Sequence, residues 1–318
     1  MAVALFCGTG AGAGAQVSYQ LVTFPSVTMT DREFLTGATP TGDITLAGIL
    51  RVPNAEGKVP AVILLEHSAG LGAPDTGYFD VWASDLNALG IATLQVDSFT
   101  ARNIVRTTFD QNQLGWLAMV NDAYRARDFL QQDQRIDPER IALMGFSRSA
   151  IAVVASTFDR FEAMHAGGKA FAAYIAMYPD CTARYKEDTA IGAQPVRIFM
   201  GELDDWTPIG PCRKYVAEAK AAGADIELTG YAGAYHVFDN PGLPSPAISI
   251  DGAATWRGCT GIAEGADGML LNAAGQPFDS ERDPCVQKAG THFGYDAGAH
   301  AKAREDVGSF LREALTLE

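Results

Sequence analysis

The stretch "IALMGFSRSA", residues 141–150, decides the fold, because an apolar run stops there and Ser147 follows at once among small residues. One explanation is a strand that ends in a turn rich in Gly and Ser before a helix. The other is a nucleophile elbow, a tight turn that exposes a serine hydroxyl above a sheet and needs small residues two positions to either side. Gly145 and Ser149 meet that need, although Ser149 stands where a second glycine is usual.

Apolar runs that predict strands alternate with helical patterns along the chain. The run at 59–68 is continuous, which is typical of a strand buried on both faces. Further strands are expected at 44–53, 91–97, 140–146, 172–179, 196–202 and 225–231, and helices at 78–90, 113–132, 148–158, 211–222 and 299–315. The alternation predicts an α/β fold with a mostly parallel, doubly wound sheet flanked by helices.

One part of the chain breaks this alternation. Residues 240–290 are rich in Gly, Pro, Asp and Ala. A loop of this length inside a compact domain is usually functional or held in place by a cross-link such as a disulfide. We therefore expect one domain over residues 16–318, with an irregular insertion at about 240–290 near the mouth of the active site.

The charge balance excludes several partners. The chain has 24 basic and 38 acidic residues, a formal net charge of −14, and no polybasic stretch. Proteins that bind nucleic acid or anionic membrane surfaces need a patch of Lys and Arg side chains, so neither partner is expected. No run reaches 18 apolar residues, and no membrane insertion is expected. Nothing in the sequence indicates an oligomeric state.

Residues 1–15 resemble a processed segment. Residues 3–7 are apolar and residues 11–15 offer small-residue cleavage sites, but the first basic residue is Arg32. We interpret 1–15 as a truncated secretory signal, with the mature chain beginning near Gln16 in a periplasmic or secreted protein. The alternative is a flexible N-terminal tail rich in Gly and Ala.

Removal of Cys7 with this segment leaves four cysteines, an even number that suggests disulfides in an exported chain. Three pairings are possible. We favour Cys181–Cys212 and Cys259–Cys285, because each pair closes a loop of roughly thirty residues. The alternative is four unpaired buried thiols in a cytosolic protein. No cysteine lies in a C-x-x-C or His-rich cluster, so no metal is expected.

A nucleophilic serine needs a base, and the base needs an orienting acid. "FMGELDDWTP" places Asp204 and Asp205 just after a predicted strand, and "GAYHVFD" places His236 just after the next strand. Taken singly, Asp204 could equally well be a turn-forming residue, and His236 an ordinary surface histidine, as a catalytic residue. Together they supply the order Ser, Asp, His that α/β-hydrolases use, at three strand ends. We therefore predict an α/β-hydrolase fold with the triad Ser147, Asp204 and His236.

The chain resembles the dienelactone hydrolase family of α/β-hydrolases in "VILLEHSAGLG", "VDSFTARN", "RIDPERIALMGFSRSA", "GELDDWTP", "GAYHVFD" and "YDAGAHAKAREDV". The resemblance implies Asp204 as the acid, with Asp205 as the fallback. It implies oxyanion donors at the backbone N–H groups of Ser68 and Arg148. The family's founding enzymes carry a cysteine nucleophile, whereas this chain has Ser147, so a general carboxylester substrate is expected in place of a dienelactone.

Four residues are candidate substrate contacts. His67 falls where the founding enzymes carry a glutamate near the nucleophile, and Arg102 could approach a substrate carboxylate, although a surface salt bridge is the alternative. Trp206 and Tyr235 flank the acid and the base and could line an aromatic pocket, with buried packing as the alternative.

These patterns predict a serine carboxylester hydrolase that acts on a small-molecule ester through an acyl-enzyme, with no cofactor. A serine peptidase on the same fold is one alternative, but the sequence offers no propeller or cap domain to build a peptide groove. A non-catalytic secreted binding protein on a hydrolase scaffold is the other, although the complete set of Ser, Asp and His argues against it.

Overall fold

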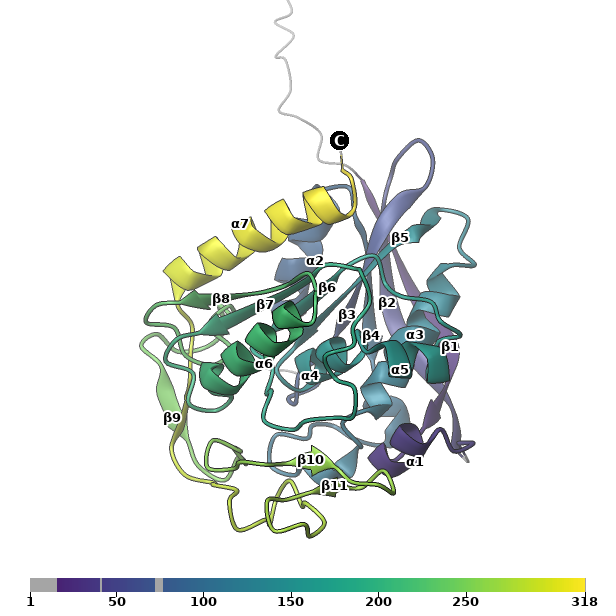
Figure 1. Ribbon diagram of the computed structural model, residues 1–318. Coiled ribbons are helices and arrows are strands. Elements are labelled where there is room, and N and C mark those ends of the chain that lie inside the picture. Colours follow the sequence, from purple (N-terminus) through teal and green to yellow (C-terminus); the bar gives the residue numbers. More distant parts are fainter. Residues whose placement is uncertain (1–15, 41, 72–76, 318) are drawn as a thin grey trace, which may run out of the picture.

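An eight-stranded sheet forms the centre of the molecule in the computed structural model, which describes residues 16–40, 42–71 and 77–317 (Figure 1). The strand order is β1-β2-β4-β3-β5-β6-β7-β8. The strands are β1 (Val17–Thr28), β2 (Gly42–Pro53), β3 (Val59–Leu65), β4 (Ala92–Asp97), β5 (Ile136–Phe146), β6 (Tyr174–Met177), β7 (Val196–Gly201) and β8 (Ile226–Tyr231). From β4 to β8 in this order, neighbouring strands pair in parallel. β2 pairs antiparallel with β1 on one side and with β4 on the other. The predicted α/β-hydrolase class with a mostly parallel sheet is confirmed.

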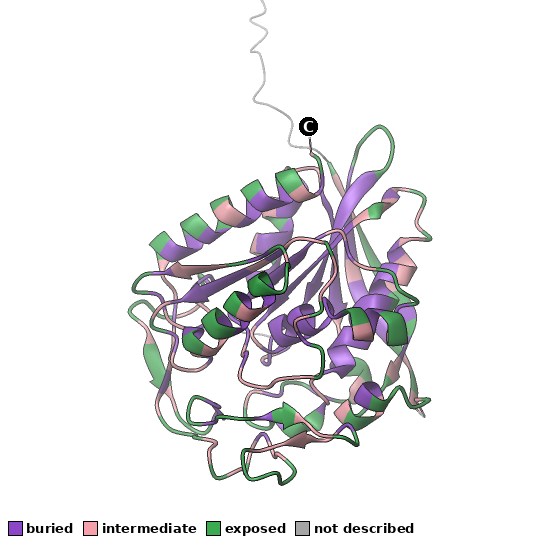
Figure 2. Cartoon of the chain, viewed as in Figure 1, coloured by how far each residue is buried: buried purple, intermediate pink, exposed green. Residues whose placement is uncertain are grey.

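Helices cover both faces of this sheet. They are α1 (Asp31–Thr36), α2 (Tyr78–Ala88), α3 (Ala118–Leu130), α4 (Arg148–Ala155), α5 (Asp159–His165), α6 (Ile209–Ala221) and α7 (Ala297–Ala314), with short 3₁₀ turns at Thr100–Arg102 and Gln111–Gln113. On β3, Ile63 and Leu65 join the core under α3, α4 and α6, whereas Val62 and Leu64 join the core under α2 and α7. All seven residues of β3 are buried, as its continuous apolar run predicts (Figure 2).

The sequence patterns missed the first strand of the sheet. β1 pairs antiparallel with β2 along its whole length. It lies at the sheet edge, so most of its residues are exposed or only half-buried, and it contains Pro25, which is typical of edge positions. A half-exposed strand with a proline lacks the continuous apolar signal of the central strands.

The predicted helix 113–132 starts later than expected. α3 begins at Ala118, because Gln111–Gln113 form a separate 3₁₀ turn and Asp31 Oδ1 accepts a hydrogen bond of 2.8 Å from the backbone N–H of Leu117. The carboxylate that caps this turn is distant in sequence, so a local pattern could not reveal it.

Residues 240–290, which we call the stapled segment, contain only the short strands β9 (Ile248–Ile250), β10 (Ala263–Glu264) and β11 (Leu270–Leu271). β9 pairs with β12 (Thr291–Phe293), which follows the segment. A small core forms within it around Trp256, Cys259 and Ile262. The segment lies along the edge of the molecule below α4 and α6 in Figure 1.

Both predicted cysteine pairs are disulfides in the structure. Cys181–Cys212 connects the loop after β6 to α6, and Cys259–Cys285 closes the stapled segment. The processed segment predicted at 1–15, with Cys7, lies outside the described residues. Among the residues that are described, no helix has both the length and the apolar character that a membrane span requires.

Candidate active site

Ser147 lies in a strained turn between β5 and α4. Its backbone has φ 53° and ψ −113°, a region that side-chain-bearing residues seldom adopt and that usually costs about 1–3 kcal/mol. A Cβ on Gly145 would lie 2.7 Å from the carbonyl oxygen of Ser149, so only glycine allows this close approach. The turn therefore has the geometry of a nucleophile elbow.

Ser149 explains why this turn tolerates serine in place of the usual second glycine. Its hydroxyl donates to the carbonyl oxygen of Leu65 at 2.9 Å, at the end of β3, and accepts from the backbone N–H of Phe146 at 2.7 Å. The side chain is completely buried. The hydroxyl thus connects the elbow to the neighbouring strand.

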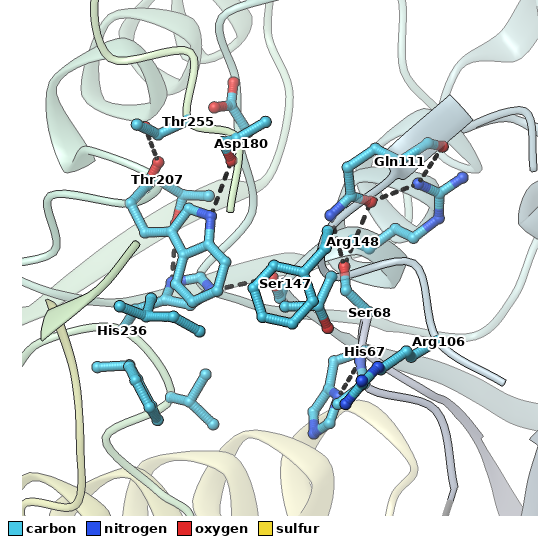
Figure 3. Close-up of a pocket in the computed structure, with 18 of the residues that line it drawn as sticks. His67, Ser68, Arg106, Gln111, Ser147, Arg148, Asp180, Thr207, His236 and Thr255 are labelled. Atoms are coloured by element: carbon cyan, nitrogen blue, oxygen red, sulfur yellow. Dashed lines mark hydrogen bonds between the residues drawn. The ribbon is translucent and has the colours of Figure 1, made fainter. Parts of the chain in front are cut away.

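The structure brings together the three residues of the predicted triad. Ser147 Oγ lies 2.9 Å from His236 Nε2, and His236 Nδ1 lies 2.7 Å from Asp204 Oδ2 (Figure 3). His236 and Asp204 are almost fully buried. Because Asp204 accepts from Nδ1–H, Nε2 is left as the acceptor that faces the serine hydroxyl. A serine, a base and an acid in this chain can generate an alkoxide-like nucleophile.

Thr207 supports this acid and was missed by the sequence patterns. Its backbone N–H donates to Asp204 Oδ1 at 2.8 Å, and its hydroxyl lies 3.0 Å from Asp204 Oδ2 and 3.1 Å from His236 Nδ1. The signal was present in "DDWTP", since an aspartate three residues before a threonine forms a turn of this kind.

Asp205, the fallback acid, lies elsewhere. It accepts hydrogen bonds of 2.7 Å from both the backbone N–H and Nδ1 of His292, and Arg257 lies 3.7 Å away. Asp205 therefore fixes β12, the strand that returns from the stapled segment, and it is Asp204 whose carboxylate contacts His236.

The loop after His236 is anchored by a buried carboxyl group. Asp239 accepts hydrogen bonds from the hydroxyls of Tyr78 and Tyr178 at 2.8 and 2.9 Å and from the indole N–H of Trp82 at 2.8 Å. Burial raises the pKa of Asp239 above its usual range, and these three donors offset part of that rise. Tyr178 also packs against the ring of His236, so this cluster holds the base in place.

A cavity of about 320 Å³ opens beside Ser147. Ser68, Arg148 and His67, all predicted site residues, line this cavity (Figure 3). Trp206, a fourth predicted residue, lines it as well. Its other walls are mostly apolar and aromatic. They include Trp116, Ile151, Leu243, Ile250, Trp256 and Phe293.

Gln111 links the two loops that carry the predicted oxyanion donors. Its Nε2 lies 3.1 Å from Ser68 Oγ, its Oε1 accepts from Arg148 Nη1 at 2.7 Å, and its backbone N–H donates to Glu281 of the stapled segment at 2.8 Å. In Figure 3 dashed lines join Gln111 to both Arg148 and Ser68. No sequence pattern indicates this role, because a glutamine in a short turn has no distinctive spacing.

Arg148 is held by more than Gln111. Its guanidinium is 4.2 Å from the centre of the Trp116 ring and also donates to the carbonyl oxygen of Leu114. Burial lowers the pKa of Arg148 to about 10, with the charge of Asp31 acting in the opposite direction, so the group stays cationic at neutral pH.

Two predicted substrate contacts lie outside the cavity. The guanidinium of Arg102 forms a nearly buried ion pair with Asp122 at 2.8 Å and donates to the carbonyl oxygens of Ser98 and Val27, so it stabilises the fold. Arg106, four residues later, lines the cavity. Tyr235 packs against His292 and is not among the residues around the cavity.

A model of the dienelactone hydrolase family matches residues 46–264, which is more than half of the chain. The chain belongs to the dienelactone hydrolase family. It is thus a hydrolase that acts on ester bonds, as predicted. No curated protein matches the sequence.

Several solved structures share the fold. A dienelactone hydrolase-like promiscuous phosphotriesterase, P91, from metagenomic libraries is 17% identical, with a TM-score of 0.59 over 95% of this chain and 99% of that chain. A dienelactone hydrolase from Klebsiella pneumoniae is 14% identical, with a TM-score of 0.52 over 70% and 89%. At these identities the likeness concerns the fold.

The described residues contain no group of three or more His, Cys, Asp or Glu side chains arranged to hold a metal ion. The charged and polar groups around Ser147 include those of the triad, the Gln111 network, His67, Arg106 and Asp180, together with Thr108, Thr207, Asn240 and Thr255. Acyl transfer through a serine nucleophile draws on side chains and backbone N–H groups of this kind.

Proposed function

We propose that this chain is a serine carboxylester hydrolase that works through a Ser147–His236–Asp204 triad and an acyl-enzyme intermediate. The observation that carries the proposal is the unbroken chain of contacts from Ser147 Oγ through both ring nitrogens of His236 to Asp204, at 2.9 and 2.7 Å. Membership of an ester-hydrolysing family supports the same chemistry.

In the first step Ser147 Oγ attacks the ester carbonyl carbon while His236 Nε2 takes the hydroxyl proton. Asp204 keeps the imidazole in the correct tautomer and stabilises its positive charge. The tetrahedral intermediate then breaks its bond to the alcohol oxygen, which leaves with the proton from His236. Water repeats the sequence on the acyl-enzyme and releases the acid.

The negative oxygen of the intermediate needs hydrogen-bond donors. We assign this role to the backbone N–H groups of Ser68 and Arg148, because both residues line the cavity next to Ser147 and Gln111 connects their side chains. Arg148 also begins α4, where the field of the helix favours negative charge. Loss of one donor of this kind typically costs about 3–4 kcal/mol of transition-state stabilisation.

We further propose that the chain forms a single domain and is exported to the periplasm or secreted. Support for export comes from the two disulfides, since such bonds persist in oxidising compartments. Export is tested by fractionating cells that express the full chain and locating it by immunoblot, with recovery in the cytoplasm alone as the contrary result.

Hydrolysis of p-nitrophenyl acetate by the wild type and by Ser147→Ala tests the catalytic proposal. We expect the variant to lose at least about 10⁴-fold in kcat while it unfolds at the same temperature. A fluorophosphonate probe should label the wild type and not the variant. A well-folded wild type that neither turns over esters nor reacts with the probe would point to a binding protein on a hydrolase scaffold.

A further inference from the structure

Three of the four tryptophans in the chain line the cavity beside Ser147. Trp116 precedes α3, Trp206 follows β7, and Trp256 belongs to the stapled segment. Three segments far apart in sequence therefore each contribute an indole to one small space. Such a concentration is typical of a binding site for a flat apolar group, because aromatic pairs gain energy beyond the area they bury.

These indoles have fixed positions and present apolar surfaces. The Trp206 N–H donates to the carbonyl oxygen of Ala254 at 3.0 Å, and the Trp256 N–H donates to that of Ser280 at 3.2 Å. Trp116 stacks on the Arg148 guanidinium and meets Trp256 edge to face at 4.8 Å. Because these contacts restrain all three rings, the cavity favours one compact shape over a flexible chain.

The position of His236 indicates which part of the ester enters the aromatic side. The alcohol must leave next to His236. Val237, the next residue in the chain, and Phe293, whose backbone pairs with that of His236, line the cavity and are therefore assigned to the alcohol side. Ile151 lies one turn after Ser147 in α4, and it forms one wall with Trp116, Trp256 and Asp180, since all four also line a small adjoining space. The acyl group, which stays bonded to Ser147, therefore extends toward this wall.

This wall closes the cavity. Ile151, Trp116, Trp256 and Asp180 line both the main cavity and a second space of only about 20 Å³. A volume of about 320 Å³ is at the small end of the range for ligand sites, which favours a compact acyl group over a long chain. Asp180 is the only carboxylate among the described residues that line the main cavity, so acyl groups with a second carboxylate are disfavoured at this wall.

From these contacts we propose that the substrates are esters of compact aromatic monocarboxylic acids, of benzoate size, and that Trp256 sets the upper limit of the acyl group. This inference rests on the proposed function. Trp256 acts here by shape, through a ring that the stapled segment holds against the acyl group.

The test compares kcat/KM for p-nitrophenyl acetate, benzoate, biphenyl-4-carboxylate and decanoate, which share one leaving group. The wild type should prefer benzoate to decanoate and to biphenyl-4-carboxylate by at least tenfold. Trp256→Ala opens the wall toward the second space, so the ratio of biphenyl-4-carboxylate to benzoate should rise at least tenfold. Trp256→Phe keeps an aromatic ring, protects the fold, and should give a smaller rise.

Leu270→Ala is the matched control, because Leu270 packs against the small core of Trp256, Cys259 and Ile262 but does not line the main cavity, so the variant loosens the segment without opening the wall. It should leave the ratio within twofold of the wild type. A ratio that moves equally in Trp256→Ala and Leu270→Ala, or a wild type that prefers decanoate, overturns the inference while acetate turnover and probe labelling of Ser147 uphold the esterase. Absence of both acetate turnover and labelling overturns the two proposals together.

Discussion

At the carboxyl edge of the sheet, side chains are placed by strands and tight turns, whereas in the stapled segment they are placed by a disulfide and a few hydrogen bonds. Ser147 follows β5 directly, and Asp204 is three residues beyond β7. Trp256, in contrast, is three residues from Cys259 in a stretch with only two- and three-residue strands. The edge thus fixes reacting atoms, and the stapled segment fixes the shape of the cavity around them.

The two aspartates of "DDWTP" separate these regions most sharply. Asp204 contacts His236, the proposed base, whereas Asp205 contacts His292 on the strand that leaves the stapled segment. We expect Asp204→Asn to lower kcat for p-nitrophenyl acetate by about 10⁴-fold, since an amide favours the wrong tautomer of His236. The matched variant Asp205→Asn should stay within about threefold of the wild type. Equal losses in the two variants would show that the acid is wrongly assigned.

Replacement of each disulfide tests whether both regions contribute to the stability of the fold while only the stapled segment determines the preference among substrates. They close loops of similar length, with sequence separations of 31 and 26 residues, so each should stabilise the fold by about 3–4 kcal/mol in the chain-entropy model. We therefore expect similar losses in urea unfolding when either pair is replaced by serines. Only the Cys259/Cys285 pair should also change the preference between benzoate and acetate, because that disulfide holds Trp256.

If the Cys181/Cys212 replacement shifts this preference as strongly, the wall of the cavity depends on the sheet edge as well. Such a result would remove the distinction drawn between the two regions. Mass spectrometry under non-reducing conditions confirms that the remaining disulfide is intact in each variant.

Gln111 connects the regions, since it contacts Ser68, Arg148 and Glu281. We expect Gln111→Leu to lower kcat by about 10- to 100-fold and to change KM by less than threefold, because displaced oxyanion donors weaken the transition state more than the ground state. Gln113→Leu is the control, because the side chain of Gln113 bonds only to nearby backbone oxygens of Arg106 and Asp110. A rise in KM without loss of kcat would assign Gln111 to substrate binding.

The sequence was most informative where function follows from strand ends. Ser147 comes directly after β5, and Asp204 and His236 come three and five residues after the ends of β7 and β8, so their meeting at one edge could be predicted from the order of the strands. The stapled segment has no such regular spacing. The sequence predicted the insertion and its cysteine pair, but not which of its residues line the cavity.

Residues that act through distant partners were beyond local patterns. Arg102 was expected at the substrate, but Asp122, twenty residues later on α3, takes its guanidinium. Asp239 gave no signal either, because its three donors come from Tyr78, Trp82 and Tyr178. A buried charge or carboxyl group is explained by its partners, and the fold alone determines which partners come close.

The smallest effect concerns Glu66, which lies directly before the loop of His67 and Ser68. Its Oε1 accepts a hydrogen bond of 2.7 Å from the backbone N–H of Ser98, and burial, reinforced by the charge of Asp97, raises its pKa well above the usual range. The native state therefore retains a proton that the unfolded chain releases near pH 4–5. The free energy of unfolding should thus fall as pH rises through the native pKa, by at most about 1.4 kcal/mol per pH unit for this one group.

Glu66→Gln keeps the acceptor for Ser98 and removes the titration. The variant should lose less unfolding free energy than the wild type between pH 5 and pH 8, as measured by urea unfolding at each pH.

Asp279, an acid of the stapled segment, should change the pH dependence of the unfolding free energy in the opposite direction. It is partly desolvated, yet hydrogen bonds from Asn112 and the Glu281 backbone N–H lower its pKa, so Asp279→Asn should reduce stability at neutral pH and not in acid. Equal pH slopes in both variants and the wild type would mean that neither group contributes measurably to the pH dependence of folding.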